Sequence, residues 1–184
     1  MFERTTIMKQ TDLGVSINYN TTGKMTNLKA YIGNGKYSNI RVDYDLKGKI
    51  VCFSSNGYDT LYKYDNHDRI VNIRYINWVT PKDHKTIREE NYTYNDQGTL
   101  TSSHINDKED DVETWNTFDI NGNIIYDKSK DSDGSIHEVY YKYDEQNRCN
   151  YMKTVTDEFV KEVSYKYDNN GNKRIYKEST IYAE

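Results

Sequence analysis

The chain has 184 residues, a formal net charge of −4 and 19 tyrosines, and only 35% of its residues are hydrophobic. The negative charge gives no overall attraction to nucleic acid, and no apolar run is long enough to span a membrane. The first residues lack the apolar region of a signal peptide. We therefore expect a cytoplasmic protein with a single domain, residues 1–184, that packs through tyrosine rings.

Residues 1–12 form a lead-in that we expect to be an edge strand, and a short motif then recurs seven times. Each copy has an aromatic residue, here position 0, followed by Asp or Asn at +1, by Gly, Asp or Asn at +4, and in most copies by an apolar residue at +6. The copies are 20 to 30 residues apart, which is typical of a repeat architecture. In copies 1 to 7, position 0 is Tyr19, Tyr44, Tyr64, Tyr94, Phe118, Tyr143 and Tyr167.

The motif predicts a β-hairpin with a type I turn. Asp or Asn at +1 accepts backbone hydrogen bonds, and the residue at +4 takes a positive φ, where Gly is favoured. The glycines with this structural role are Gly23, Gly48, Gly98, Gly122 and Gly171. Position +1 then lies opposite +5. This predicts the cross-strand ion pairs Asp45–Lys49, Asp65–Arg69 and Asp144–Arg148.

Repeated hairpins predict an all-β protein, an antiparallel meander of about 14 strands that curls into a spiral or half-barrel, because open sheets rarely exceed ~10 strands. Position 0 is expected opposite +6, and −2 opposite +8, on one side that we call the tyrosine face. The pairs predicted for −2 and +8 are Val42–Cys52, Tyr62–Asn72, Tyr141–Tyr151 and Tyr165–Ile175. A second set of turns, variable in length, joins the hairpins at the other edge, as at residues 80–85 and 106–111.

Two rows of charge appear when the copies are aligned. The basic row, position +10, contains Lys29, Arg74, His104, Lys128, Lys153 and Lys177, with Ser54 in copy 2. The acidic row, position −5, runs through Gly14, Asn39, Asp59, Glu89, Glu113, Glu138 and Glu162. Strict alternation places the basic row on the tyrosine face and the acidic row on the opposite face, whereas a bulge would change this parity. The alternative interpretation is a solvated surface whose charges protect the sheet from aggregation.

Segments 62–65, 141–144 and 165–171 resemble the YD repeats of Rhs proteins, whose pattern is Tyr-x-Tyr-Asp-x-x-Gly-Arg-Leu. The resemblance extends from Ile17 to Ile175. In that family the repeats form a long β-strip that spirals into a hollow shell, often around a toxin domain, so the resemblance implies a β-strip here. This chain is far shorter, Arg-Leu is usually replaced, and no toxin domain follows the last copy. We therefore carry over the strip and not an encapsulated toxin.

No sequence pattern indicates an enzyme. The four histidines have no metal-ligand spacing, and Asp131 to Ser135 fails as a calcium loop. Neither Cys52 nor Cys149 has a histidine in a catalytic relation, and both are expected to be free thiols in a reducing compartment. We expect no catalytic residue, no metal and no cofactor.

These observations favour a non-enzymatic binding module with a protein partner, similar in type to immunity proteins and phage-borne inhibitors of defence complexes. A homodimer through the tyrosine face, binding of RNA or single-stranded DNA along rings and lysines, and binding of carbohydrate at a cell surface are the alternatives. Tyrosine richness could also reflect sheet propensity alone. The candidate partner-binding residues are the basic row together with Tyr62, Tyr64, Tyr92, Tyr94, Tyr141 and Tyr143.

Overall fold

The computed structural model describes residues 7–11, 15–80 and 83–183, and all of its regular structure there is β. The lead-in before residue 7, Gly14 and the tip of the turn at residues 81–82 lie outside the described residues. The 15 strands are β1 (Ile7–Thr11), β2 (Val15–Tyr19), β3 (Met25–Gly33), β4 (Lys36–Tyr44), β5 (Ile50–Ser55), β6 (Tyr58–Tyr64), β7 (Ile70–Thr80), β8 (Asp83–Tyr94), β9 (Leu100–Asp107), β10 (Val112–Phe118), β11 (Ile124–Lys130), β12 (Ile136–Tyr143), β13 (Cys149–Val155), β14 (Phe159–Tyr167) and β15 (Lys173–Tyr182).

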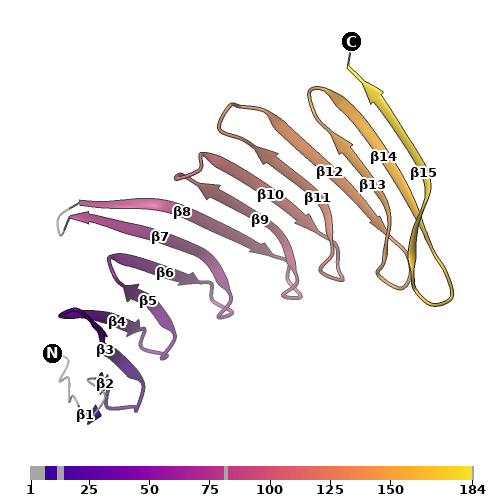
Figure 1. The fold of residues 1–184 in the computed structure, drawn as a ribbon. Coiled ribbons are helices and arrows are strands. Elements are labelled where there is room, and N and C mark those ends of the chain that lie inside the picture. The colour runs from indigo at the N-terminus through magenta and orange to yellow at the C-terminus, as the bar shows by residue number, and fades with distance from the viewer. Residues whose placement is uncertain (1–6, 12–14, 81–82, 184) are drawn as a thin grey trace. The chain divides into compact units, whose positions relative to one another are not determined.

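The strands follow one another in chain order as an antiparallel meander, as predicted. The chain divides into two compact units, Met1–Glu89 and Glu90–Glu184. Within each unit, contacts between described strands join only strands that are neighbours in the sequence, and the strands bend along their length (Figure 1). Each unit is therefore a single layer of curved sheet. The described residues include no helix long and apolar enough to cross a membrane.

The predicted hairpin turn is present in every copy. All five turn glycines have positive φ, from 78° at Gly23 to 86° at Gly98, and Asp68 and Asn147 replace them at φ 69° and 59°. In copy 5, the Gly122 amide donates to the Asp119 carbonyl at 3.1 Å. The Asp119 carboxylate accepts the amide of Asn123 at 2.8 Å. The turn residues therefore have the roles that the sequence predicts.

Two of the three predicted ion pairs across the turns form. Arg69 contacts Asp65 at 2.7 Å, and Arg148 contacts Asp144 at 2.8 Å. The third is wrong, because the Lys49 ammonium pairs with Asp68 of the next turn. Asp68 stands where most copies have Gly, and its carboxylate is within reach of the preceding turn.

A β-bulge follows position +6 in most hairpins. In copy 2, Tyr44 pairs with Ile50 as predicted, but Asp43 pairs with Cys52, so Val51 is an extra residue. The same shift occurs at the same place in copies 1, 3, 5 and 6. Because of it, −2 lies opposite +9 and −3 lies opposite +10. A bulge of this kind also increases the local twist, which agrees with the bent strands.

Because of the bulge, three of the four pairs predicted between −2 and +8 are wrong. Val42 pairs with Phe53 and Tyr62 with Ile73, and Tyr141 likewise pairs with a residue one place later than predicted, Met152. In copy 7 the bulge comes two positions later, with Tyr176 as the extra residue, so Tyr165–Ile175 is confirmed.

Because of the bulge, the apolar side chains of each unit lie mainly on one face of its sheet. In copies 1, 2, 3, 5 and 6 the tyrosine face holds positions −4, −2, 0, +6 and +9, whereas the opposite side, here the charged face, holds −5, −3, −1, +8 and +10. In copy 7, Ile175 at +8 lies on the tyrosine face opposite Tyr165. Val42 and Val163, both on the tyrosine face, are 3% exposed. The only other buried apolar side chain among the described residues is Cys52 on the charged face. A single layer buries few side chains, because each one is covered only by its neighbours in the sheet.

Candidate binding faces

Position-0 tyrosines join consecutive copies along the tyrosine face. In four copies the hydroxyl at position 0 donates to the backbone carbonyl at +6 of the preceding copy. The bonds are Tyr44 to Met25 and Tyr64 to Ile50, both at 2.9 Å, and Tyr143 to Ile124 and Tyr167 to Cys149, both at 2.8 Å. These tyrosines therefore hold the sheet together as well as lining its face.

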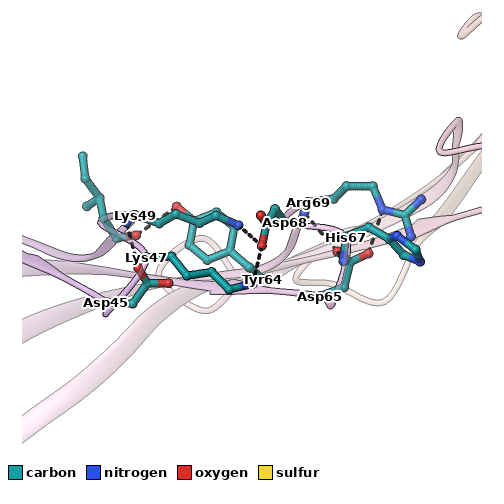
Figure 2. Close-up of polar contacts among 9 residues, drawn as sticks. Asp45, Lys47, Lys49, Tyr64, Asp65, His67, Asp68 and Arg69 are labelled. Carbon is teal, nitrogen blue, oxygen red and sulfur yellow. Dashed lines mark hydrogen bonds and ion pairs between the residues drawn. The ribbon is translucent and has the colours of Figure 1, made fainter.

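Cations at +5 lie over the position-0 rings of the next copy. Lys49 lies 4.7 Å from the centre of the Tyr64 ring. Figure 2 shows these two side chains together with the Asp65–Arg69 pair of the next turn. Arg148 lies 4.4 Å from the Tyr167 ring in the same way. Such contacts contribute roughly 0.5–1 kcal/mol each at exposed sites. The ring, its hydroxyl and the cation form one repeated unit at the turn edge.

Phe118 is the exception at position 0, since it has no hydroxyl to donate. We expect Phe118→Tyr to stabilise the protein by about 0.5–1.5 kcal/mol, the net contribution of one hydrogen bond, by donating to the Leu100 carbonyl. Urea denaturation would measure this gain. Tyr143→Phe, the reverse change in the next copy, is the control and should cost a similar amount. A loss of stability in Phe118→Tyr would contradict the role assigned to position 0.

The structure places the basic row on the charged face, so its predicted position on the tyrosine face is wrong. Position +10 lies opposite −3, as in Trp115–Lys128 and Tyr140–Lys153, because the bulge shifts the register by one. The same pairing holds for Lys29, Arg74 and Lys177. The acidic row shares this face, so the predicted separation of the two rows is also wrong.

The two rows pair with each other across adjacent hairpins. Lys128 is opposite Glu138 and Lys153 is opposite Glu162, with N–O distances of 3.8 and 3.9 Å. His104 lies 3.6 Å from Glu113. Cations and anions that alternate in this way largely cancel each other's field, so the charged face offers no continuous basic track in these copies.

Aromatic rings fill the space between these charges. Trp115 stacks on His104 with ring centres 5.0 Å apart, and Lys128 approaches its ring at 5.8 Å. The hydroxyls of Tyr126 and Tyr140 donate to Glu138 at 2.7 and 3.1 Å. The hydrogen bonds from both hydroxyls hold the pKa of Glu138 below its usual value. Trp115 and the basic side chains beside it are therefore committed to contacts within the sheet.

Because these lysines pair within the sheet, replacing one should affect the stability of the fold more than partner binding. We expect Lys153→Glu to destabilise the protein by about 0.2–1 kcal/mol, because it places a carboxylate opposite Glu162. Lys63→Glu lies on the same face at −1, and Lys63 forms no ion pair with any residue that the structure describes, so it serves as the control. Thermal melts of the two variants would measure the difference. Equal melting temperatures would contradict the pairing of the two rows.

Four of the candidate tyrosines lie where they were predicted, at −2 and 0 of the tyrosine face: Tyr62, Tyr64, Tyr141 and Tyr143. The sequence contains a signal for the bulge that alternation alone misses. The second strand of copies 1, 2, 3 and 6 is apolar at both +6 and +9, a spacing of three that a regular strand cannot place on one face. Met25 with Leu28 and Ile50 with Phe53 are examples.

Aspartates at +1 of the later turns are held in the ionised state. Hydrogen bonds from the side chain at +5 lower the pKa of Asp119, Asp144 and Asp168. Backbone amides of each turn add to this effect by donating to the same carboxylates. In the unfolded chain an aspartate titrates near pH 3.9. Folding therefore favours the carboxylate form at these positions.

We expect stability to fall on acidification in a defined pH range. A lowered pKa in the folded state stabilises the protein above about pH 4 and loses this effect as the pH falls through the folded-state value. Asp144→Asn should reduce the dependence, because Asn accepts the same turn hydrogen bonds uncharged, as Asn20 and Asn95 do. Urea midpoints at about pH 7, 4 and 3 would measure it. An unchanged slope in the variant would contradict this assignment.

One shallow pocket lies between the turns of copies 2 and 3 in the first unit, with a volume of about 450 Å³. Its lining includes three lysines, Lys47, Lys49 and Lys63, and three aspartates, Asp45, Asp65 and Asp68. Lys47 and Lys49 both pair with Asp68 (Figure 2). Because its charges are balanced and paired, the pocket has no clear preference for an anion or a cation.

The described residues contain no group of three or more His, Cys, Asp or Glu side chains that could hold a metal ion. Cys52 and Cys149 are free thiols. Asp131 to Gly134 forms another hairpin turn, in which the Gly134 amide donates to the Asp131 carbonyl at 2.9 Å.

Fold and repeat together define a class of protein, an antiparallel sheet built from repeated β-hairpins. No known protein-family model matches the chain, and no curated protein matches it. The fold is similar to the crystal structure of TcdB2-TccC3-TEV, a Tc toxin that contains Rhs and YD repeats, with a TM-score of 0.64 and 14% sequence identity. The match covers 92% of this chain and 10% of that one, so this chain spans about a tenth of its length. A porin-like protein from Bacteroides uniformis has 13% sequence identity, and the match covers 97% of this chain and 93% of that one. Its TM-score is only 0.32, which is too low to support a conclusion about the fold of this chain.

Proposed function

We propose that this chain is a non-enzymatic binding module, a short relative of YD-repeat proteins, that docks a protein partner on its tyrosine face. The observation that supports this is the segregation of side chains by the bulge. In each unit the apolar positions collect on one side of a single layer, and no described strand of that unit covers them. An amphipathic sheet normally buries its apolar face against another element. A protein surface is the partner that supplies such cover.

The charged face favours protein over nucleic acid. Single-stranded nucleic acid needs open rings next to unpaired cations. Here Lys128 and Lys153 face Glu138 and Glu162, and Trp115 is stacked on His104. A cytoplasmic inhibitor, of the immunity or anti-defence type, is the role that we propose for the module, and it needs neither a metal nor a cofactor.

Capture from lysate of the organism that encodes the chain tests the proposal, with nuclease-treated and untreated samples. Ile50→Lys and Ile175→Lys place a charge on the tyrosine face of each unit, at residues that are 38% and 61% exposed. Tyr140→Lys, on the charged face and also 38% exposed, is the matched control. Exposed positions are chosen so that the variants fold.

A protein that survives nuclease, is lost with Ile50→Lys or Ile175→Lys and is retained with Tyr140→Lys would support the proposal. A partner that disappears with nuclease would indicate nucleic-acid binding instead. Loss with Tyr140→Lys alone would move the site to the charged face.

A further inference from the structure

A polar row interrupts the tyrosine face of the second unit. Ser103 on β9, Asn116 on β10 and Asp127 on β11 lie side by side, since Asn116 pairs with both of the others. They occupy positions −2 and +9, where other copies have apolar or tyrosine side chains: Ile17, Val42, Tyr62 and Tyr141 at −2, and Leu28, Phe53, Ile73 and Met152 at +9. The row is therefore local to these three strands and is absent from the repeat pattern.

The row has more hydrogen-bond acceptors than donors. The Asn116 amide nitrogen donates to the Ser103 hydroxyl at 3.3 Å, but the buried Asn116 Oδ1 accepts no hydrogen bond from any described residue. The Asp127 carboxylate has no hydrogen bond or ion pair within the described part of the chain. Burial raises the pKa of Asp127, as expected for a carboxyl that no donor compensates.

Cations on the same face of this unit are already engaged. Lys161 contacts Glu178 at 2.6 Å, and Lys173 lies 3.6 Å from the centre of the Tyr165 ring. His137 lies 3.4 Å from Asp131. Lys128, next to Asp127 in the chain, points to the charged face and pairs with Glu138. Among the described residues, therefore, no cation of this face contacts the Asp127 carboxylate.

We propose that Asp127 and Asn116 anchor the partner on the tyrosine face, and that the partner is an apolar protein segment carrying a lysine or arginine. The apolar residues around the row would bury the body of the segment, while its cationic group donates to the Asp127 carboxylate and to Asn116 Oδ1. An arginine could reach both acceptors with one planar group. This inference rests on the proposed function and specifies the chemistry of its partner.

Small probes with one ring and different charge test the chemistry without the natural partner. Benzylammonium, benzyl alcohol and phenylacetate share an apolar ring and carry a positive, a neutral and a negative group. Each is titrated into the full chain while backbone amide NMR signals are followed. We expect benzylammonium to shift amides of β9 to β11 and to bind about tenfold more tightly than benzyl alcohol, the order expected for a charge-assisted hydrogen bond. Asp127→Asn should remove this preference.

Equal binding of the three probes, or binding of none, would overturn the inference, as would an undiminished preference in Asp127→Asn. The probes test charge preference at the row, whereas the lysate experiment tests the binding face, so the two ideas can fail separately. Self-association of the chain that Asp127→Asn abolishes would also overturn the inference, because a second copy would then be the occupant.

Melting temperatures add an independent test. An uncompensated carboxyl destabilises the free chain, so Asp127→Leu should raise the melting temperature. Glu138→Leu is the matched control on the opposite face, where Tyr126, Tyr140 and Lys128 all contact the carboxylate, and it should lower the melting temperature. A lower melting temperature in Asp127→Leu would show that the row satisfies itself and would overturn the inference.

Discussion

Val42→Asp is expected to destabilise the protein by about 3–5 kcal/mol, the cost of an uncompensated charge in a buried position. Val42 is 3% exposed on the tyrosine face, opposite Phe53 and between Ile40 and Tyr44 on its own strand. Ile40 and Phe53 have no group that can donate to a carboxylate, and the Tyr44 hydroxyl already donates to the Met25 carbonyl at 2.9 Å. Since domains are stable by only about 5–15 kcal/mol, this change alone should remove a large part of the folding free energy.

Urea denaturation followed by circular dichroism would measure the loss. Val42→Thr is the matched control, because it keeps the branched shape and adds only a hydroxyl, at a cost of about 1–3 kcal/mol. If Val42→Asp were as stable as the wild type, Val42 could not be shielded from water. The bulge register that places it on the tyrosine face would then be wrong.

Gly122→Val is expected to cost about 1–3 kcal/mol. Gly122 has a φ of 84° in the turn of copy 5, a conformation that a β-branched residue avoids. A Cβ at this position would meet no atom within 4 Å, so the cost comes from the backbone and not from a clash. Thermal or urea denaturation would measure the change.

Gly122→Asn separates backbone strain from any general effect of a side chain. Asn147 occupies the same turn position in copy 6 with a φ of 59°, so the local conformation is one that Asn accepts. We expect Gly122→Asn to lose much less stability than Gly122→Val. Equal losses in the two variants would contradict the explanation by positive φ.

Turns and first strands could be predicted from the sequence because their interactions are local. Asp or Asn at +1 and Gly at +4 lie within a few residues of the groups that they contact, and positive φ is confirmed at Gly23, Gly48, Gly98, Gly122 and Gly171. The pairing of position 0 with +6 follows from the turn length, and it too is confirmed. The all-β meander then follows from repetition of one hairpin.

The face on which the side chains after +6 lie could not be predicted from strict alternation. One extra residue after +6 moves every later side chain of that strand to the other face, so Lys128 and Lys153 lie opposite Glu138 and Glu162 on the charged face. The Lys49 pair depends on Asp68 in the next hairpin, which the turn rules within one copy do not include. The row of Ser103, Asn116 and Asp127 was also missed, because it forms only when three strands are in register.

The amino-acid sequence by itself therefore determined the repeat, the turn conformation and the hairpin as the unit of the fold, since each depends on contacts within about ten residues. The tertiary structure decided which face each second strand presents, and with it the separation of an apolar tyrosine face from a charge-paired face. The physical reason is that in copies 1, 2, 3 and 6 the bulge places the apolar side chains at +6 and +9 on one face beside neighbouring strands, a gain that exists only once the sheet has formed.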